Sequence, residues 1–523
     1  MAALQDVSLL MRIKHLSYII LMTALFLSGC YKPGPGARPW QASWQDDEDY
    51  QAVLPGENET ISPTEEVANI IELIEERYVT PTPNPPITLP TPRSETVTYV
   101  VQQGDTLRRI AQQYQVTITQ IVDENSIPNP DLIEVGQVLI IPPPVFDAAI
   151  PFFKILPDSE LINSPSNADF DVATFVQGYS GYLAFYEEEV EGVVLTGAEI
   201  VDRVALLYSV NPRLLLTILE FQSKWVTDEN PFEETRQYPL GNYDSRRAGL
   251  YKQLGWAANL LNEGYYSWKR ELIRVWMLSD SSMIEVEPTI NPGTAGVLNL
   301  MRYLTTRSDW DWAVSEAGIF ATYYQFFGYP FDVAYEPMIP EDLLQPELQL
   351  PFELGAVWSY TGGPHGGWDS GSAWAGLDFA PPGEPRGCVP SDAWVVASAA
   401  GQIVYSDHGA VIQDLDGDGI WQTGWSILYM HIDTNNRVEV GTFLEAGDRV
   451  GHPSCEGGFS TGTHLHIARR YNGEWIAADG DLPFVMDGWE ADGYGVEYNG
   501  YLFKGDTVLE AWNGRTPFNA IQR

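Results

Sequence analysis

Two histidines one residue apart constrain the fold of the C-terminal part of this chain. They lie in the stretch "TGTHLHIARR", residues 461–470. On a β-strand, side chains two residues apart point to the same face. We therefore expect His464 and His466 to share one face while Leu465 and Ile467 point into a core. Two imidazoles on one face suit a metal ion or a pair of proton carriers; the alternative is a surface strand with two incidental histidines.

The remaining histidines favour the first alternative. Of seven in the chain, one is His15 and the other six follow residue 360. The same region is rich in glycine, tryptophan and β-branched residues, and stretches such as "GWSILYMHI" are typical of strands joined by turns. No H-E-x-x-H motif occurs, which excludes the helical zinc-protease motif. The pattern predicts an all-β domain with a candidate metal site.

The charge balance limits the partners of the protein. The chain has 523 residues, for which roughly three domains are expected. With 29 basic and 71 acidic residues, the formal net charge is −42. Such a charge argues against binding to nucleic acid and against electrostatic adhesion to anionic lipid.

The N-terminus has the features of an export signal. A basic start (Arg12, Lys14) precedes an apolar run that is short for a membrane span, so we interpret residues 1–29 as a signal peptide. The residues "LSGC" that end at Cys30 resemble a bacterial lipobox, which implies cleavage before Cys30 and lipidation of its sulfur. The alternative is an ordinary signal peptide. A lipid anchor would be the only attachment to a membrane, and we expect an exported protein of the cell envelope, lipid-anchored or secreted.

A linker and a small module follow. Residues 30–95 are acidic and proline-rich and are expected to form an extended tether.

Residues 96–144 resemble a LysM module, a βααβ fold that binds glycans containing N-acetylglucosamine. The residues that match its pattern are Gly104, Asp105, Thr106, Asn125, Pro130, Gly136 and Pro142. The resemblance implies glycan binding near Gly104, Asp105, Thr106 and Asn125. Asp105 and Thr106 are also expected to cap the first helix.

Residues 150–348 are predicted to be mostly helical, with a helix break at Asn211-Pro212. The stretch "NPRLLLTILEFQSKW" loosely resembles the start of lysozyme-like transglycosylase domains, which carry a glutamate directly before a serine. Here Gln222 precedes Ser223, and an amide cannot protonate a glycosidic oxygen. We therefore interpret this region as a helical spacer or as a degenerate lysozyme-like fold that binds glycan. Glycan cleavage through Glu220 is the weaker alternative.

The C-terminal region, residues 350–523, resembles a known peptidase family. Over about residues 355–490, "GGPHGGWDSGSAWAGLDFA", "YMHI" and "THLHIARRYNGEW" resemble zinc endopeptidases of the lysostaphin and β-lytic type, which cut peptidoglycan peptides. In the compact branch of this family, the first histidine ligand comes four residues before the aspartate. Counted back from Asp378, that position is Trp374, which cannot bind a metal. The β-lytic branch places the first histidine further upstream, and His365 precedes Asp378 by thirteen residues.

The resemblance implies a role for each site residue. His365, Asp378 and His466 would bind Zn²⁺ and leave a fourth position open, as in catalytic zinc sites. His464 and His431 would transfer protons and stabilise the oxyanion. The β-lytic branch also implies a Cys388–Cys455 disulfide close to the site; from the residues alone, two separate buried thiols are the alternative.

The acidic stretch "DLDGDG", residues 414–419, resembles the start of a calcium loop, but its twelfth position is Trp425 rather than glutamate. A polar turn between strands is the preferred interpretation, with calcium as the alternative. His408 and His452 have no role in the peptidase pattern.

The chain is thus predicted to be a multidomain α+β protein: signal, linker, βααβ LysM module, mostly helical middle domain and all-β zinc peptidase domain. The predicted function is that of a peptidoglycan hydrolase. The LysM module would bind glycan strands, and the C-terminal domain would cut stem-peptide or cross-bridge amide bonds. A catalytically inactive scaffold or activator that binds the cell wall is the competing hypothesis.

Overall fold

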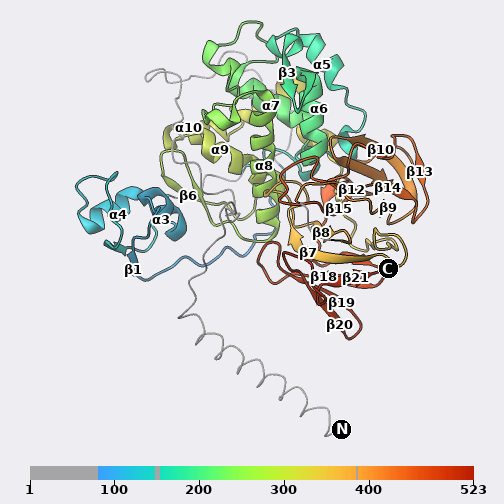
Figure 1. Ribbon diagram of the computed structural model, residues 1–523. Coiled ribbons are helices and arrows are strands. Elements are labelled where there is room, and N and C mark those ends of the chain that lie inside the picture. The colour runs from blue at the N-terminus through green and yellow to red at the C-terminus, as the bar shows by residue number, and fades with distance from the viewer. Residues whose placement is uncertain (1–80, 148–152, 384–386) are drawn as a thin grey trace. The chain divides into compact units, whose positions relative to one another are not determined.

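The computed structural model describes residues 81–147, 153–383 and 387–523 (Figure 1). The expected signal peptide, the lipidation site Cys30 and the linker up to residue 80 lie outside these ranges. Residues 81–94 contain neither helix nor strand. Among the described residues, no helix combines the length and apolarity that crossing a membrane requires.

The LysM segment has the expected βααβ order. Its elements are β1 (Val97–Val100), α3 (Leu107–Tyr114), α4 (Ile118–Asn125) and β2 (Val138–Ile141), with β1 and β2 antiparallel. They enclose their own core, which includes Leu107, Ile110 and Ile121. Thr106 caps α3 as predicted, because its hydroxyl accepts a hydrogen bond from Arg109 N. Asp105 does not cap the helix; its carboxylate accepts bonds from Gln102 N and the Tyr99 hydroxyl, both at 2.6 Å.

The middle region is mostly helical, as predicted. Its helices are α5 (Val172–Tyr179), α6 (Gly197–Tyr208), α7 (Pro212–Ser223), α8 (Leu250–Lys269), α9 (Pro292–Leu304), α10 (Arg307–Ala313) and α11 (Ile319–Phe327). Two hairpins accompany them: β3 (Glu187–Val190) with β4 (Val193–Thr196), and β5 (Val275–Met277) with β6 (Met283–Glu285). The break between α6 and α7 occurs where it is expected. Asn211 caps α7 by accepting a hydrogen bond from Arg213 N, and Pro212 occupies the first helical position.

Glu220, the candidate catalytic residue for glycan cleavage, is buried and hydrogen-bonded to the segment after α7. It is 4% exposed, and its carboxylate accepts hydrogen bonds from the backbone N–H groups of Val226 and Thr227 and from the Thr227 hydroxyl. These bonds hold the segment that follows α7. A carboxylate so occupied is poorly placed to donate a proton to a substrate.

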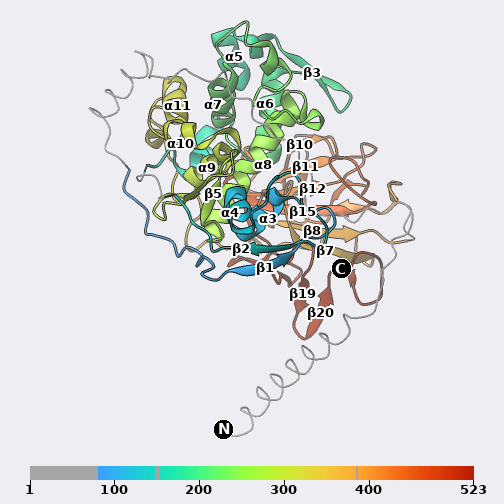
Figure 2. The same ribbon diagram turned by 90° about the vertical axis from the view of Figure 1, so that its left-hand side faces the viewer.

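The C-terminal region is all-β. Its large sheet has the order β13-β10-β11-β12-β15-β8-β7-β21, and β16 pairs with β15. Figure 2 shows β10, β11, β12, β15, β8 and β7 following one another. The bounds are β7 (Val357–His365), β8 (Gly376–Ala380), β10 (Gly401–Asp407), β11 (Ala410–Asp414), β12 (Trp425–Met430), β13 (Phe443–Leu444), β15 (Leu465–Tyr471), β16 (Glu474–Trp475) and β21 (Ala520–Gln522). Smaller sheets join β9 (Val395–Val396) to β14 (Arg449–Gly451), and β17 (Val485–Met486), β18 (Trp489–Asp492), β19 (Tyr501–Lys504) and β20 (Thr507–Glu510) to one another.

The two faces of the large sheet belong to different cores. Leu465 and Ile467 on β15 lie in the core of the C-terminal region, as the alternating pattern predicts. On the opposite face, Ala468 and Leu428 belong to the same apolar cluster as the helices of the middle region. The middle region therefore packs against the sheet face on which His466 lies.

The C-terminal end of β15 strengthens this junction. Arg470 is 1% exposed and donates to the carbonyls of Leu206 (3.0 Å) and Leu207 (3.2 Å), in the last turn of α6. Its guanidinium carbon lies 3.8 Å from the centre of the Trp475 ring. A buried cation at a helix C-terminus interacts favourably with the helix dipole.

Candidate metal centre

The three expected metal ligands come from three adjacent strands. His365 ends β7, Asp378 lies in the middle of β8, and His466 is the second residue of β15. β8 lies between the other two strands, and His466 is directly opposite Asp378 in the antiparallel register. Strand pairing thus brings together residues that are 101 positions apart in the chain.

The side chains converge on one point. His365 Nε2 lies 2.9 Å from His466 Nδ1, and Asp378 Oδ1 lies 3.2 Å from each of these nitrogens. A tetrahedral zinc ion with bonds of about 2.0–2.1 Å holds its ligand atoms about 3.3–3.4 Å apart. The triangle of ligand atoms is therefore close to the size that such an ion requires. All three residues are buried.

The outer ring nitrogens of the two histidine ligands are hydrogen-bonded to backbone carbonyls. His365 Nδ1 lies 2.8 Å from the Gly363 carbonyl, and His466 Nε2 lies 3.0 Å from the Gly367 carbonyl. Because a carbonyl oxygen only accepts, each of these outward nitrogens carries a proton. In the neutral form of each ring, which a metal ligand must adopt, the inward nitrogen presents its lone pair to the other ring and to the carboxylate. Three acceptors facing one another fit a bound cation, and the outward bonds are those typical of metal-bound imidazoles.

Burial and neighbouring groups shift the pKa values of the ligand residues. Burial opposes ionisation of Asp378, but the adjacent His365 and His464 outweigh it and hold the pKa of that carboxyl well below its usual range. Burial lowers the pKa of His466, which favours the neutral ring that a metal ligand must have. The centre thus combines an ionised carboxylate with imidazole donors.

His431 and His464 lie beside this triangle. His431 directly follows β12 and His464 directly precedes β15, and their ring centres are 4.4 Å apart. Each donates from Nδ1 to a backbone carbonyl at 2.8 Å, of Glu456 and Gly462 respectively. His464 Nε2 lies 3.6 Å from Asp378 Oδ1. Burial and the neighbouring imidazoles lower the pKa of His431 to about 3, so its Nε2 is an unprotonated acceptor near neutral pH.

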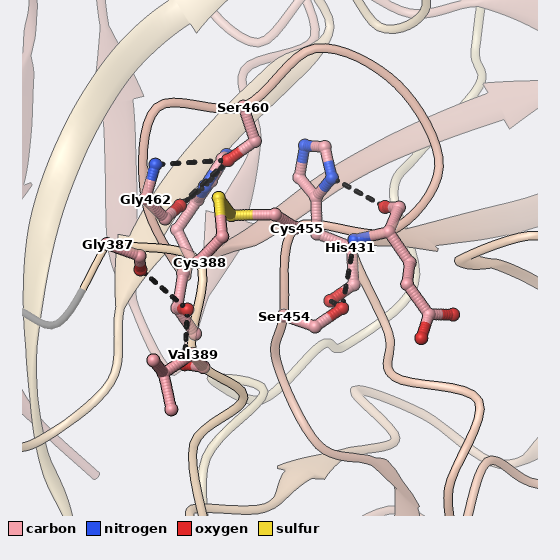
Figure 3. The surroundings of a disulfide bond; sticks show 11 residues. Gly387, Cys388, Val389, His431, Ser454, Cys455, Ser460 and Gly462 are labelled. Carbon is pink, nitrogen blue, oxygen red and sulfur yellow. Dashed lines mark hydrogen bonds between the residues drawn. A yellow bond between two sulfur atoms is a disulfide. The ribbon is translucent and has the colours of Figure 1, made fainter.

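The disulfide expected from the resemblance is present, and the two segments that it joins hydrogen-bond to the segments that carry these two histidines (Figure 3). It links Cys388 to Cys455, with a Cα–Cα distance of 5.3 Å. Next to Cys455, Ser454 N donates to the His431 carbonyl at 2.6 Å. Next to Cys388, the Gly387 carbonyl accepts from Thr463 N at 2.9 Å. The disulfide therefore supports the loops on both sides of the His431–His464 pair.

Tyr498 is a neighbour of the site that the sequence did not reveal. Its ring stacks on His365, with ring centres 4.2 Å apart and an angle of 21° between the planes. Its carbonyl accepts from Gly363 N at 2.8 Å, and its N–H donates to Pro364 O at 3.1 Å. No spacing in "ADGYGVEYNG" indicates this contact, because it depends on a chain segment that follows β18 and returns to β7.

The other histidines lie away from the centre. His408 is in the turn between β10 and β11, where its Nε2 lies 3.4 Å from an Arg203 nitrogen of α6. His452 packs on Trp394 and bonds to the Ala393 carbonyl.

The "DLDGDG" stretch forms the turn between β11 and β12. One oxygen of each of its three carboxylates lies within 4.8 Å of the others, and Asp414 accepts bonds from the N–H groups of Asp416 and Gly419. These bonds account for a turn, and calcium binding stays an untested alternative.

The four residues expected to bind glycan also have structural contacts. Gly104 adopts a positive φ of 88°, which the turn before α3 requires. Asn125 binds the backbone of Ile140 through both ends of its amide, at 2.7 Å each, and so ties α4 to β2. Their part in glycan binding stays a prediction.

Three family models match the chain in succession. They are the LysM domain over residues 99–142, the LasA N-terminal domain over residues 154–339, and peptidase family M23 over residues 373–478. The last match begins after His365. The middle region thus corresponds to a segment of a known peptidase.

Two relatives match over parts of the same regions. Protease LasA from Pseudomonas aeruginosa is 26% identical over 292 residues, which cover 52% of this chain and 66% of that protein. The beta-lytic metalloendopeptidase of Lysobacter enzymogenes is 30% identical over 159 residues, which cover 29% of this chain and 83% of that protein. The chain spans just under two thirds of the length of Protease LasA.

Among solved structures, the M23 metalloprotease Pseudoalterin is 22% identical and matches with a TM-score of 0.27, covering 34% of this chain and 99% of that one. The catalytic domain of lysostaphin from Staphylococcus simulans is 26% identical, with a TM-score of 0.17, covering 23% of this chain and 87% of that one.

Proposed function

Since the chain belongs to peptidase family M23, together with the beta-lytic metalloendopeptidases, we propose that it is a zinc-dependent endopeptidase that cleaves peptide bonds of peptidoglycan. The observation that carries this proposal is the convergence of His365 Nε2, Asp378 Oδ1 and His466 Nδ1, with both ring N–H groups turned outward. These three residues would hold the ion. Two nitrogens and one carboxylate oxygen are a donor set that zinc accepts readily.

When bound, zinc supplies Lewis acidity that polarises a peptide carbonyl and lowers the pKa of water. The chain's own residues then have to move protons. His431 and His464 each keep Nδ1–H on a backbone carbonyl, so the tautomer of both rings leaves Nε2 as the acceptor. Either Nε2 can take the proton of an attacking water and, once protonated, donate to the developing oxyanion or to the leaving amine.

Peptidoglycan is the proposed substrate because the LysM match and the peptidase match occur in one chain. The LysM module would hold the glycan while the C-terminal centre cuts stem peptides or cross-bridges. Two binding modules on one polymer raise the local concentration of the bond to be cut. We place the protein outside the cytoplasm, in the cell envelope, with Cys30 as the proposed site of a lipid anchor.

Product analysis tests the reaction. Purified protein incubated with peptidoglycan is expected to release new amino groups without new reducing sugar ends, and a chelator or His466→Ala should abolish the release. New reducing ends would instead indicate glycosidic cleavage. Wall binding without any product would support the inactive scaffold.

A further inference from the structure

The loop between the first two ligands is held by the middle region. Residues 366–375 connect β7 to β8 and lie against helices α6 and α8. Gly371 N donates to Asn259 Oδ1 of α8 at 2.7 Å, and Asn259 Nδ2 donates to the Ser370 hydroxyl at 3.3 Å. The hydroxyl of Tyr208, the last residue of α6, donates to Asp369 Oδ2 at 3.2 Å.

The loop fits closely against α8 at one glycine and against β16 at another. A Cβ on Gly371 would lie 2.0 Å from the backbone oxygen of Asn259, and a Cβ on Gly367 would lie 2.6 Å from the Trp475 ring. Real Cβ atoms do not approach other atoms so closely, so a side chain at Gly371 would force the loop away from α8. The loop conformation therefore depends on the surface of the helix as well as on its own sequence.

The same loop orients a metal ligand. The Gly367 carbonyl accepts the bond from His466 Nε2 at 3.0 Å, and Gly367 N is itself fixed to the Ala373 carbonyl at 3.0 Å. The carbonyl keeps the proton on the outer nitrogen of His466 and sets the angle of the ring. Hydrogen-bond partners of this kind typically change metal affinity or activity by about 10–100-fold when they are lost.

We propose that the middle region completes the metal centre: Asn259 and Tyr208 are positioning residues that hold the 366–375 loop so that the Gly367 carbonyl orients His466. This inference rests on the proposed function only in requiring that the centre binds a metal. It replaces the interpretation of the middle region as a spacer, because a spacer would have no effect on the ligands.

The strands beside the loop contact the same two helices. Trp475 is 1% exposed, and its indole N–H donates to the carbonyl of Tyr208. On the same side, the Tyr265 hydroxyl of α8 donates to Glu474 at 3.1 Å, and Lys269 pairs with Glu474 as well. The strand pair that carries His466 is thus tied to the same two helices that hold the loop.

The test uses the full chain and three variants. Asn259→Ala removes both bonds to the loop, Tyr208→Phe removes only a hydroxyl, and Asn299→Ala is the matched control. Asn299 of α9 is a buried amide whose hydrogen bonds go to Leu260 O and Glu263 of α8 and to Arg302, and not to the 366–375 loop. Each protein is titrated with Zn²⁺ against a competing chelator, and its Co²⁺ form is examined by visible absorption, which reports ligand geometry.

Asn259→Ala is expected to weaken Zn²⁺ binding about tenfold and to change the Co²⁺ spectrum. Asn259→Asp, which keeps the acceptor for Gly371 N, should restore most of the affinity. Asn299→Ala should lower thermal stability and leave both metal readouts unchanged. Tyr208→Phe should change the Co²⁺ spectrum as Asn259→Ala does. It also provides the test if Asn259→Ala fails to fold.

Wild-type metal affinity and an unchanged Co²⁺ spectrum in the folded Asn259→Ala variant would overturn the inference. If only Tyr208→Phe folds, an unchanged spectrum in that variant would overturn it equally. A wild-type chain that binds no metal at all would instead refute the proposed function, so the two failures are distinguishable.

Discussion

The disulfide offers a quantitative test of how the site is stabilised. Cys388 and Cys455 are 67 positions apart, and the cross-link closes that long loop in the unfolded chain. By the chain-entropy relation, such a loop corresponds to about 4 kcal/mol of stabilisation at 25 °C. Replacing both cysteines by serine should therefore lower the unfolding free energy of the C-terminal region by about that amount.

The assay is guanidinium unfolding followed by tryptophan fluorescence, compared between wild type and the Cys388→Ser/Cys455→Ser variant. Reductant should lower the wild-type midpoint to that of the variant and leave the variant unchanged, which controls for the serine side chains. Activity should also fall, because the disulfide supports the segments that carry His431 and His464. A loss of stability below about 1 kcal/mol would refute the reasoning, since the entropic effect alone should exceed it.

Other predictions address the junction, the chemistry and the LysM module. Arg470→Met leaves two carbonyls of α6 without their charged donor and should cost about 2–4 kcal/mol, measured by calorimetry; an unchanged unfolding temperature would contradict this role. His431→Ala should lower kcat about 100-fold or more with Zn²⁺ content retained, whereas loss of the metal would make His431 a structural support of the centre. Deleting residues 96–144 should reduce binding to insoluble peptidoglycan in a sedimentation assay and spare hydrolysis of soluble muropeptides, because this segment has its own core.

The parts predictable from the sequence were those with a local signal. The period of two in "THLHI" places Leu465 and Ile467 in the core and His466 on the opposite face, as the structure shows. The break at Asn211-Pro212 was equally local, since a capping amide and a proline act on their own helix.

The remaining parts depend on contacts between distant segments. Tyr498 reaches His365 only because the segment after β18 returns to β7. The carbonyls that fix the histidine tautomers are backbone groups, which every residue has, so the sequence does not indicate them. The same holds for Asn259, whose contact with Gly371 spans 112 positions. Asp105 shows that even a local expectation fails when a nearby hydroxyl, here of Tyr99, competes for the carboxylate.

Metal stoichiometry tests the central claim most directly. We predict one Zn²⁺ per purified chain, lost in His365→Ala and in His466→Ala and retained in Asp416→Asn, which alters the other acidic cluster. Loss of the ion should coincide with loss of peptide cleavage. A wild-type chain that cleaves peptidoglycan peptides without metal, or a His466→Ala variant that keeps a full equivalent of zinc, would contradict the account.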